Sequence, residues 1–312
     1  MIAFVLSGGG NRGAVQAGAL LALLERNIRP DLIIGTSVGA LNGVALASNP
    51  TPEGARWIAE SWRKVRRTDI FPGNSLTVGW RLLIGRGSLH AQDAFYRFVR
   101  SMLPAHVERF AHLSVPCVVT ATVLNSGQLR LFGADPQERV VDAIMASTAI
   151  PPFFPPYRYG GELLVDGAVV ANLPLALAIG RGALTIYALN IVDEAAPTSG
   201  SSLGETLAYA LSAMLSHQDA QEQRIAGLLR RRGVTIHDVR LAVDRPRAYN
   251  DFGNSAALIA AGQRAAAAYL DAHAATRAGR LLPLLREAAR AGAFMSLLRH
   301  RLLLPQRLGT RD

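Results

Sequence analysis

Two glycine-rich segments of this sequence carry groups that could perform acyl-transfer chemistry. The first runs from Ser7 to Gly13 and the second from Gly35 to Gly39. Each follows a short apolar run typical of a buried strand, at residues 2–6 and 32–34, and precedes apolar residues at helical spacing. Loops that follow neighbouring parallel strands emerge at the same edge of a sheet, so we expect the two segments to lie close together.

The second segment has the G-x-S-x-G spacing of a nucleophile elbow. Its members are Gly35, Thr36, Ser37, Val38 and Gly39. A serine on a tight strand-to-helix turn is held in strained backbone geometry, and glycines beside it prevent collisions there. The hydroxyl of Ser37 would then stand clear, over the positive end of the following helix. The alternative is an ordinary glycine-bracketed turn with an idle serine.

The first segment could hold a developing negative charge. Its members are Gly8, Gly9, Gly10, Asn11, Arg12 and Gly13. Glycines permit positive φ angles and leave backbone N–H groups unshielded, which suits an oxyanion hole. The same residues also satisfy the G-x-G-x-x-G dinucleotide fingerprint. That interpretation requires an acidic residue at the end of the second strand, whereas Asp31 precedes the strand, so it is disfavoured.

A serine hydroxyl needs a base to become a good nucleophile. A triad of Ser37, Asp166 and His217 can be written in the order Ser, Asp, His. Two features oppose it: Ser37 follows only the second strand, and His217 falls in the middle of a predicted helix. The other candidate is Asp166 itself, which ends a short apolar run and precedes Gly167 and Ala168. An ordinary Asp-Gly turn is the competing interpretation.

Length and composition indicate one large α/β domain, with or without a helical appendage. The chain has 312 residues, of which 50% are hydrophobic and 18% charged. The 33 basic against 23 acidic residues give a net charge of +10, which predicts attraction to anionic surfaces. Since no nucleic-acid motif is present, a phospholipid surface is favoured over nucleic acid. The single cysteine, Cys117, favours a reducing compartment, and the sequence shows neither a signal peptide nor a membrane span. We therefore expect a cytoplasmic protein, with a peripheral position at the inner membrane face as the alternative.

Two segments each allow two interpretations. Residues 69–90 are irregular, glycine-punctuated and apolar, which suits a lid or an acyl-binding wall but equally a loop docked on the core. Residues 277–312 carry eight arginines against Glu287 and Asp312, interleaved with leucines. This pattern is typical either of a basic amphipathic membrane anchor or of helices packed on the domain.

The rest of the chain alternates between strand and helix patterns. Predicted strands cover 115–124, 128–133, 163–165, 184–191 and 234–243, and predicted helices cover 53–67, 91–102, 140–149, 203–231 and 255–274.

Together the glycine loop, the elbow and Asp166-Gly167-Ala168 resemble the patatin-like phospholipase family. That family has G-G-G-x-R/K-G, G-x-S-x-G and D-G-A/G motifs in this order. Residues 146–151, followed by Phe153 and Pro155, also resemble the family's proline segment before the aspartate. The resemblance covers roughly residues 1–262 and does not include the tail.

The resemblance implies a three-layer α/β/α fold with a mainly parallel central sheet. Residues 1–276 would form the catalytic domain and 277–312 a basic helical extension. Ser37 would attack an ester with Asp166 as proton acceptor, without histidine, metal or cofactor. The amides around Gly9, Gly10 and Asn11 would hold the oxyanion, and Arg12 would support that loop. The implied substrate is a phospholipid or lysophospholipid. Two other activities remain open: an acyltransferase using the same acyl-enzyme and, less favoured, a dinucleotide-binding oxidoreductase. Nothing in the sequence indicates an oligomeric state.

Overall fold

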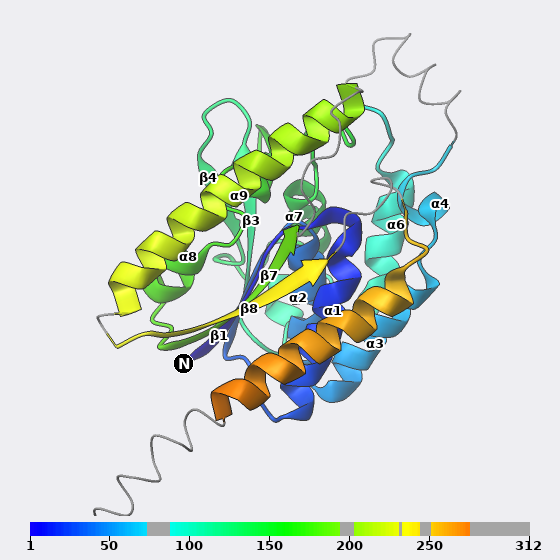
Figure 1. Cartoon of the computed structure of the whole chain (residues 1–312). Coiled ribbons are helices and arrows are strands. Elements are labelled where there is room, and N and C mark those ends of the chain that lie inside the picture. Colours follow the sequence, from blue (N-terminus) through cyan, green and yellow to red (C-terminus); the bar gives the residue numbers. More distant parts are fainter. Residues whose placement is uncertain (74–87, 194–202, 231–232, 244–250, 275–312) are drawn as a thin grey trace, which may run out of the picture. The chain divides into compact units, whose positions relative to one another are not determined.

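The computed structural model describes residues 1–73, 88–193, 203–230, 233–243 and 251–274 (Figure 1). The chain divides into two compact units, Met1–Ala267 and Ala268–Asp312. Of the second unit the structure describes only 268–274, the end of a helix that spans 255–274. Most of the predicted lid segment, residues 74–87, and the whole basic tail at 277–312 lie outside the described residues.

A mixed sheet forms the centre of the first unit. Its parallel part has the order β3-β2-β1-β7-β8 and consists of β3 (Cys117–Val123), β2 (Leu32–Thr36), β1 (Ile2–Leu6), β7 (Thr185–Asp193) and β8 (Thr235–Val243). Three antiparallel strands continue from β3: β4 (Leu129–Phe132) and β6 (Glu162–Asp166) both pair with it, and β5 (Tyr157–Tyr159) pairs with β6. The loops after β1 and β2 therefore leave the same edge of the sheet.

Helices cover both faces of the sheet. Ala3, Val5 and Ile34 pack in one cluster with residues of α8 (Leu175–Gly180). Phe4 and Ile33 are also buried but point to the opposite face, because side chains alternate along a strand. Figure 1 shows α8 and α9 (Leu203–Arg230) on one side, and α1 (Gly13–Glu25) and α3 (Pro52–Lys64) on the other. The predicted three-layer architecture is confirmed.

The remaining described helices mostly match the predicted ones. They are α2 (Val38–Ser48), α4 (Arg67–Ile70), α6 (Asp93–Met102) and α7 (Val140–Ser147). Among the described helices, none combines the length and the apolar character that crossing a bilayer requires.

The predicted helix over 53–67 is interrupted, which is a correction to its boundary. Helix α3 ends at Lys64 because Val65 and Arg66 adopt extended backbone angles. A separate short helix, α4, starts after them, where the Asp69 carboxylate accepts a hydrogen bond from the Arg66 N–H at 2.8 Å. The short elements β5 and α8 were not predicted, since three and six residues are too few to show a clear period.

Helix α1 and the helix at 255–267 pack with their backbones in close contact. A Cβ atom placed on Gly262 would collide with the Val15 carbonyl oxygen, and one on Gly18 would collide with the Ile259 carbonyl oxygen. The Gln263 amide also donates to the Glu25 carboxylate at 3.2 Å. Only glycine at these two positions permits this approach, which fixes α1 and hence the glycine loop before it.

Gly262→Ala should therefore destabilise the protein, by about 1–3 kcal/mol, because the added methyl group meets backbone that cannot move aside. Gly227→Ala on α9 is the matched control, since a Cβ there meets no atom within 4 Å. That change should leave the free energy of unfolding unaltered or raise it by up to about 1 kcal/mol. Chemical denaturation of both variants checks the prediction, and equal stability of the two would contradict it.

Candidate active site

Ser37 occupies a sharp turn between β2 and α2. Its backbone angles are φ 55° and ψ −125°, a region that residues other than glycine rarely adopt. The turn requires glycine at positions 35 and 39. A Cβ on Gly39 would collide with the Leu6 carbonyl oxygen, and one on Gly35 would collide with the Gly39 carbonyl oxygen. Such strain, on the order of 1–3 kcal/mol, is typical of functional positions. The geometry is that of a nucleophile elbow, with Ser37 at the N-cap position of α2 and its hydroxyl free of any capping hydrogen bond to the helix.

The sheet brings Asp166 to Ser37 although 129 positions separate them in the sequence. Strand β6 ends at Asp166 and pairs with β3, which in turn pairs with β2. The Ser37 Oγ donates a hydrogen bond of 2.6 Å to Asp166 Oδ2, and the Ala168 N–H donates one of 2.8 Å to Oδ1. The Asp-Gly pair is not a hairpin tip: the turn between β5 and β6 is formed by residues 160 and 161.

Burial controls the electrostatics of this carboxyl group. Asp166 is fully buried and Ser37 is 7% exposed. Loss of water around the carboxylate raises the pKa of Asp166 to about 7, and the hydrogen bonds from Ser37 and the Ala168 N–H oppose this rise. An aspartate with a pKa near neutrality is a much stronger base than an exposed one, while still being ionised in a large fraction of molecules.

The glycine loop lies directly against the serine. A Cβ on Gly8 would come within 3.1 Å of the Ser37 Cβ. The Gly8 N–H donates to Asn172 Oδ1 at 3.1 Å, and the Arg12 Nε donates to the Gly9 carbonyl at 3.1 Å. Within the described residues, no protein acceptor is seen for the N–H groups of Gly9 and Gly10. These two amides are therefore available to a ligand, whereas that of Gly8 is engaged.

A second residue of the loop is tied to a distant part of the chain. The Asn11 side chain donates to the Asp251 carbonyl at 2.8 Å. Phe252, beside Asp251, stacks with Phe71, and Phe71 stacks with Phe154 of the proline segment. An apolar aromatic cluster thus connects the segment before Asp166 with the segment that holds the loop.

A buried network of polar side chains holds the two ends of the glycine loop. The Gln16 Nε2 donates to the Ser7 carbonyl at 2.8 Å and to the Leu189 carbonyl at 3.2 Å. The Asn42 Nδ2 donates to the Gly13 carbonyl at 3.0 Å and to Gln16 Oε1 at 3.1 Å. The Trp62 indole completes the chain by donating to Asn42 Oδ1 at 2.8 Å. Polar groups buried in this way hold one geometry, because any movement would leave them without partners.

The other predicted motif residues pack around the elbow. A Cβ on Gly13 would collide with the Val38 side chain, so the two motifs are in contact. Thr36 Oγ1 lies 2.7 Å from Thr120 Oγ1 and donates to the Ala171 carbonyl at 3.1 Å. Gly167 lies close to Thr120, because a Cβ on this glycine would collide with the Thr120 carbonyl oxygen.

Two residues at the site were not predicted from the sequence. Ser147 Oγ accepts a hydrogen bond of 2.8 Å from the Ser37 N–H, and Asn172 contacts Gly8. Neither belongs to a spacing pattern with Ser37. The one signal for Asn172 is its place as a polar residue within the apolar run 168–175, which suggests a buried role.

The structure also bears on the alternatives. His217 lies on α9 as predicted, where it is exposed and contacts Gln221 at 2.9 Å. Asp31 accepts a hydrogen bond of 2.7 Å from the Ile2 N–H, at the opposite end of β1 from the glycine loop. It is therefore not placed to hold a ribose beside that loop. Among the described residues, no group of three or more His, Cys, Asp or Glu side chains could hold a metal ion.

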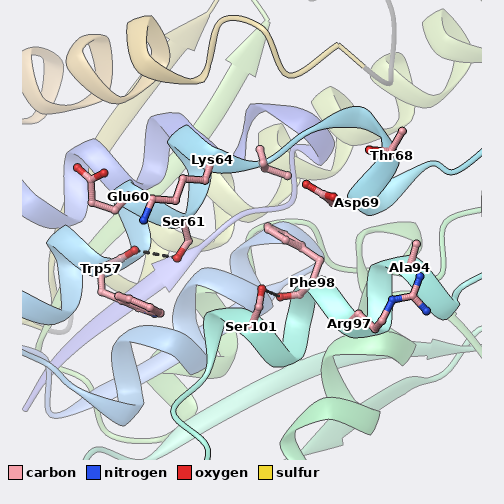
Figure 2. A pocket seen from close by; sticks show the side chains of 11 residues that line it. Trp57, Glu60, Ser61, Lys64, Thr68, Asp69, Ala94, Arg97, Phe98 and Ser101 are labelled. Carbon is pink, nitrogen blue, oxygen red and sulfur yellow. Dashed lines mark hydrogen bonds between the residues drawn. The ribbon is translucent and has the colours of Figure 1, made fainter.

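A separate groove lies between α3, α4 and α6 (Figure 2). It has a volume of about 480 Å³. Phe98 forms part of its lining, and its ring meets that of Trp62 edge-on at 6.0 Å. Glu60, on its wall, forms an ion pair with Arg63. The groove contains neither Ser37 nor Asp166, so it is not the place where these two groups could act.

Known proteins show which family shares these features. The sequence profile of the family described as Patatin-like phospholipase matches residues 4–179. The chain is 30% identical over 207 residues to Patatin-like phospholipase domain-containing protein 6 of Mus musculus, covering 66% of this chain and 14% of that protein. It is 28% identical over 213 residues to Lysophospholipase NTE1 of Mycosarcoma maydis, covering 66% of this chain and 10% of that protein.

A solved structure has a similar fold. VipD from Legionella pneumophila superposes with a TM-score of 0.51 at 15% sequence identity, covering 87% of this chain and 67% of that one. The family profile spans more than half of the chain and includes both glycine motifs and the Asp-Gly-Ala segment. This chain belongs to the patatin-like phospholipase family.

Proposed function

We propose that this chain is a serine lipid acyl hydrolase that uses Ser37 as nucleophile and Asp166 as the only base. The observation that carries the proposal is the 2.6 Å hydrogen bond from Ser37 Oγ to the buried carboxylate of Asp166. In this arrangement the hydroxyl already points its proton at the group that must accept it. No histidine is then required between the two.

The first half of the reaction forms an acyl-enzyme. Ser37 Oγ attacks the carbonyl carbon of the ester while its proton moves to Asp166 Oδ2. The carbonyl oxygen becomes negatively charged and accepts hydrogen bonds from the N–H groups of Gly9 and Gly10. When the tetrahedral intermediate collapses, the bond to the leaving alcohol breaks, and Asp166 returns the proton to that alcohol.

The second half releases the fatty acid. A water molecule attacks the acyl carbon and gives its proton to Asp166, and the same two amides stabilise the second oxyanion. Collapse breaks the bond to Ser37 Oγ, which takes the proton back from Asp166. The raised pKa of Asp166 suits both halves, since the group must accept and donate a proton near neutral pH.

A lipid is the substrate class that the surroundings support best. The relatives carry the names of phospholipase-domain proteins and a lysophospholipase. The aromatic cluster of Phe71, Phe154 and Phe252 is a buried apolar region between the segments that contact Asp166 and the glycine loop. An apolar region beside the reacting groups is compatible with a substrate that carries an acyl chain. We propose phospholipids or lysophospholipids as substrates on these grounds.

Replacing either of the two reacting side chains should abolish most of the hydrolysis. Ser37→Ala should lower kcat by about 10³-fold or more, since the nucleophile is lost. Asp166→Asn should lower it by about 10² to 10⁴-fold, because an amide cannot accept the proton. Release of fatty acid from lysophosphatidylcholine measures the effect. Ser101→Ala, at an exposed position of α6, is the control and should stay within about twofold of wild type. Activity retained in Ser37→Ala would contradict the proposal.

The pH dependence of kcat/KM should reflect the raised pKa of Asp166. Protonation removes the base, so kcat/KM should fall on the acid side, about tenfold per pH unit, with a midpoint near the pKa of about 7. Initial rates with a neutral ester between pH 4 and 9 measure this limb, while circular dichroism verifies folding at each pH. A midpoint near 4, the ordinary value for an aspartate, would show that the base is exposed or is another group.

A further inference from the structure

We infer that Asp219 is a positioning residue for the glycine loop. It fixes the orientation of the Asn172 side-chain amide, and this amide in turn holds the loop at Gly8. The inference rests on the proposed function only in its catalytic consequence. Asp219 lies on α9, far from Ser37 in sequence and outside every motif identified above. The inference is based on hydrogen bonds between α9 and the segment after Asp166. Figure 1 shows α8, which ends this segment, beside α9.

Three residues of helix α9 form hydrogen bonds with this segment and with the start of α8. Gln218 Oε1 accepts a hydrogen bond of 3.3 Å from the Asn172 N–H, and Gln218 Nε2 donates one of 2.6 Å to the Val169 carbonyl. Asp219 Oδ1 accepts one of 3.0 Å from Asn172 Nδ2. One turn further along α9, Glu222 Oε2 accepts one of 3.2 Å from the Ala176 N–H, at the start of α8. The backbone on either side of Asn172 is therefore held independently of Asp219.

The amide of Asn172 could face either way without Asp219. An amide presents an acceptor oxygen and a donor nitrogen of nearly the same size, so its neighbours decide which atom points where. Asp219 accepts from Nδ2, and this leaves Oδ1 facing the Gly8 N–H at 3.1 Å. A reversed amide would place two donors together at Gly8. Asn190 also donates to the Asp219 carboxylate, which holds that group in turn.

Gly8 leads directly into the two amides that we propose as oxyanion donors. Its N–H is the point at which the loop is attached to the segment that carries Asp166. If that bond is lost, Gly9 and Gly10 lose their attachment to the segment that carries Asp166, and only the contacts at the two ends of the loop and at Asn11 remain to hold them. Transition-state stabilisation by backbone amides depends on such fixed geometry. Asp219 should therefore affect kcat more than KM, although it does not touch the substrate.

The experiment follows the hydrogen exchange of the Gly8 amide by NMR on the full chain labelled with ¹⁵N-glycine, together with kcat and KM. Asp219→Leu and Asn172→Asp should each speed this exchange by about tenfold or more. The first change removes the acceptor of Asn172 Nδ2, so the Asn172 amide is no longer oriented toward Gly8. The second places two carboxylates side by side, so their repulsion moves the group at 172 away. Turnover should fall by about tenfold with KM within about twofold.

The exchanged pair Asn172→Asp/Asp219→Asn provides the sharpest arm of the test. In it, the carboxylate at 172 can accept both from the Gly8 N–H and from the amide at 219, so the pattern is restored with one negative charge, as in the wild type. Gly8 exchange and kcat should both return to within about threefold of wild-type values. A general loss of packing would not be rescued in this way.

Glu222→Leu is the matched control, because it removes a carboxylate from the same helix without touching Asn172. It should leave Gly8 exchange within about twofold of wild type. The inference is overturned if Glu222→Leu accelerates the exchange as much as Asp219→Leu, if Asn172→Asp has no effect, or if the exchanged pair is not rescued. An inactive wild type would refute the proposed function alone, since the exchange measurement does not depend on turnover.

Discussion

The hydrogen bond between Ser37 and Asp166 is the interaction on which the proposed reaction depends, and the pairing of strands in the sheet makes it possible. A fully buried carboxylate is costly unless it has partners, and here its partners are one hydroxyl and one backbone N–H. The antiparallel pairing of β6 with β3, next to parallel β2, brings Asp166 to the end of the strand that precedes Ser37. One interaction thus connects an early elbow with a late strand, and the same burial raises the basicity of the carboxyl group.

The glycine loop needs a different kind of support, because glycines have no side chains of their own to hold them. Gln16 and Asn42 donate to the carbonyl groups of Ser7 and Gly13, the two ends of the loop, and Trp62 in turn donates to Asn42. Asn172 holds the Gly8 N–H, and Asn11 reaches Asp251. Only the middle of the loop, Gly9 and Gly10, is left with amides directed to no protein acceptor among the described residues. The pattern is what an anion-binding loop requires.

Much of the fold and of the proposed reacting pair could be predicted from sequence, because both depend on local signals. The glycine spacing around Ser37 reflects a backbone turn, and the apolar runs before it reflect burial. Asp166 was recognised only in combination with the other motifs, since Asp-Gly by itself is a common turn. The supporting residues could not be predicted: Ser147, Asn172 and Asp219 act through contacts between segments distant in sequence, and no spacing rule connects them. The split between α3 and α4 was missed because it depends on two extended residues, Val65 and Arg66.

The most direct test of the account is intact-mass analysis after treatment with a fluorophosphonate, which reacts much faster with an activated serine than with an ordinary one. The account predicts a single adduct, located on Ser37 by peptide mapping, that is absent in Ser37→Ala and forms much more slowly in Asp166→Asn. An adduct on another serine, or an unchanged labelling rate in folded Asp166→Asn protein, would contradict the claim that Ser37 is the nucleophile and Asp166 its base.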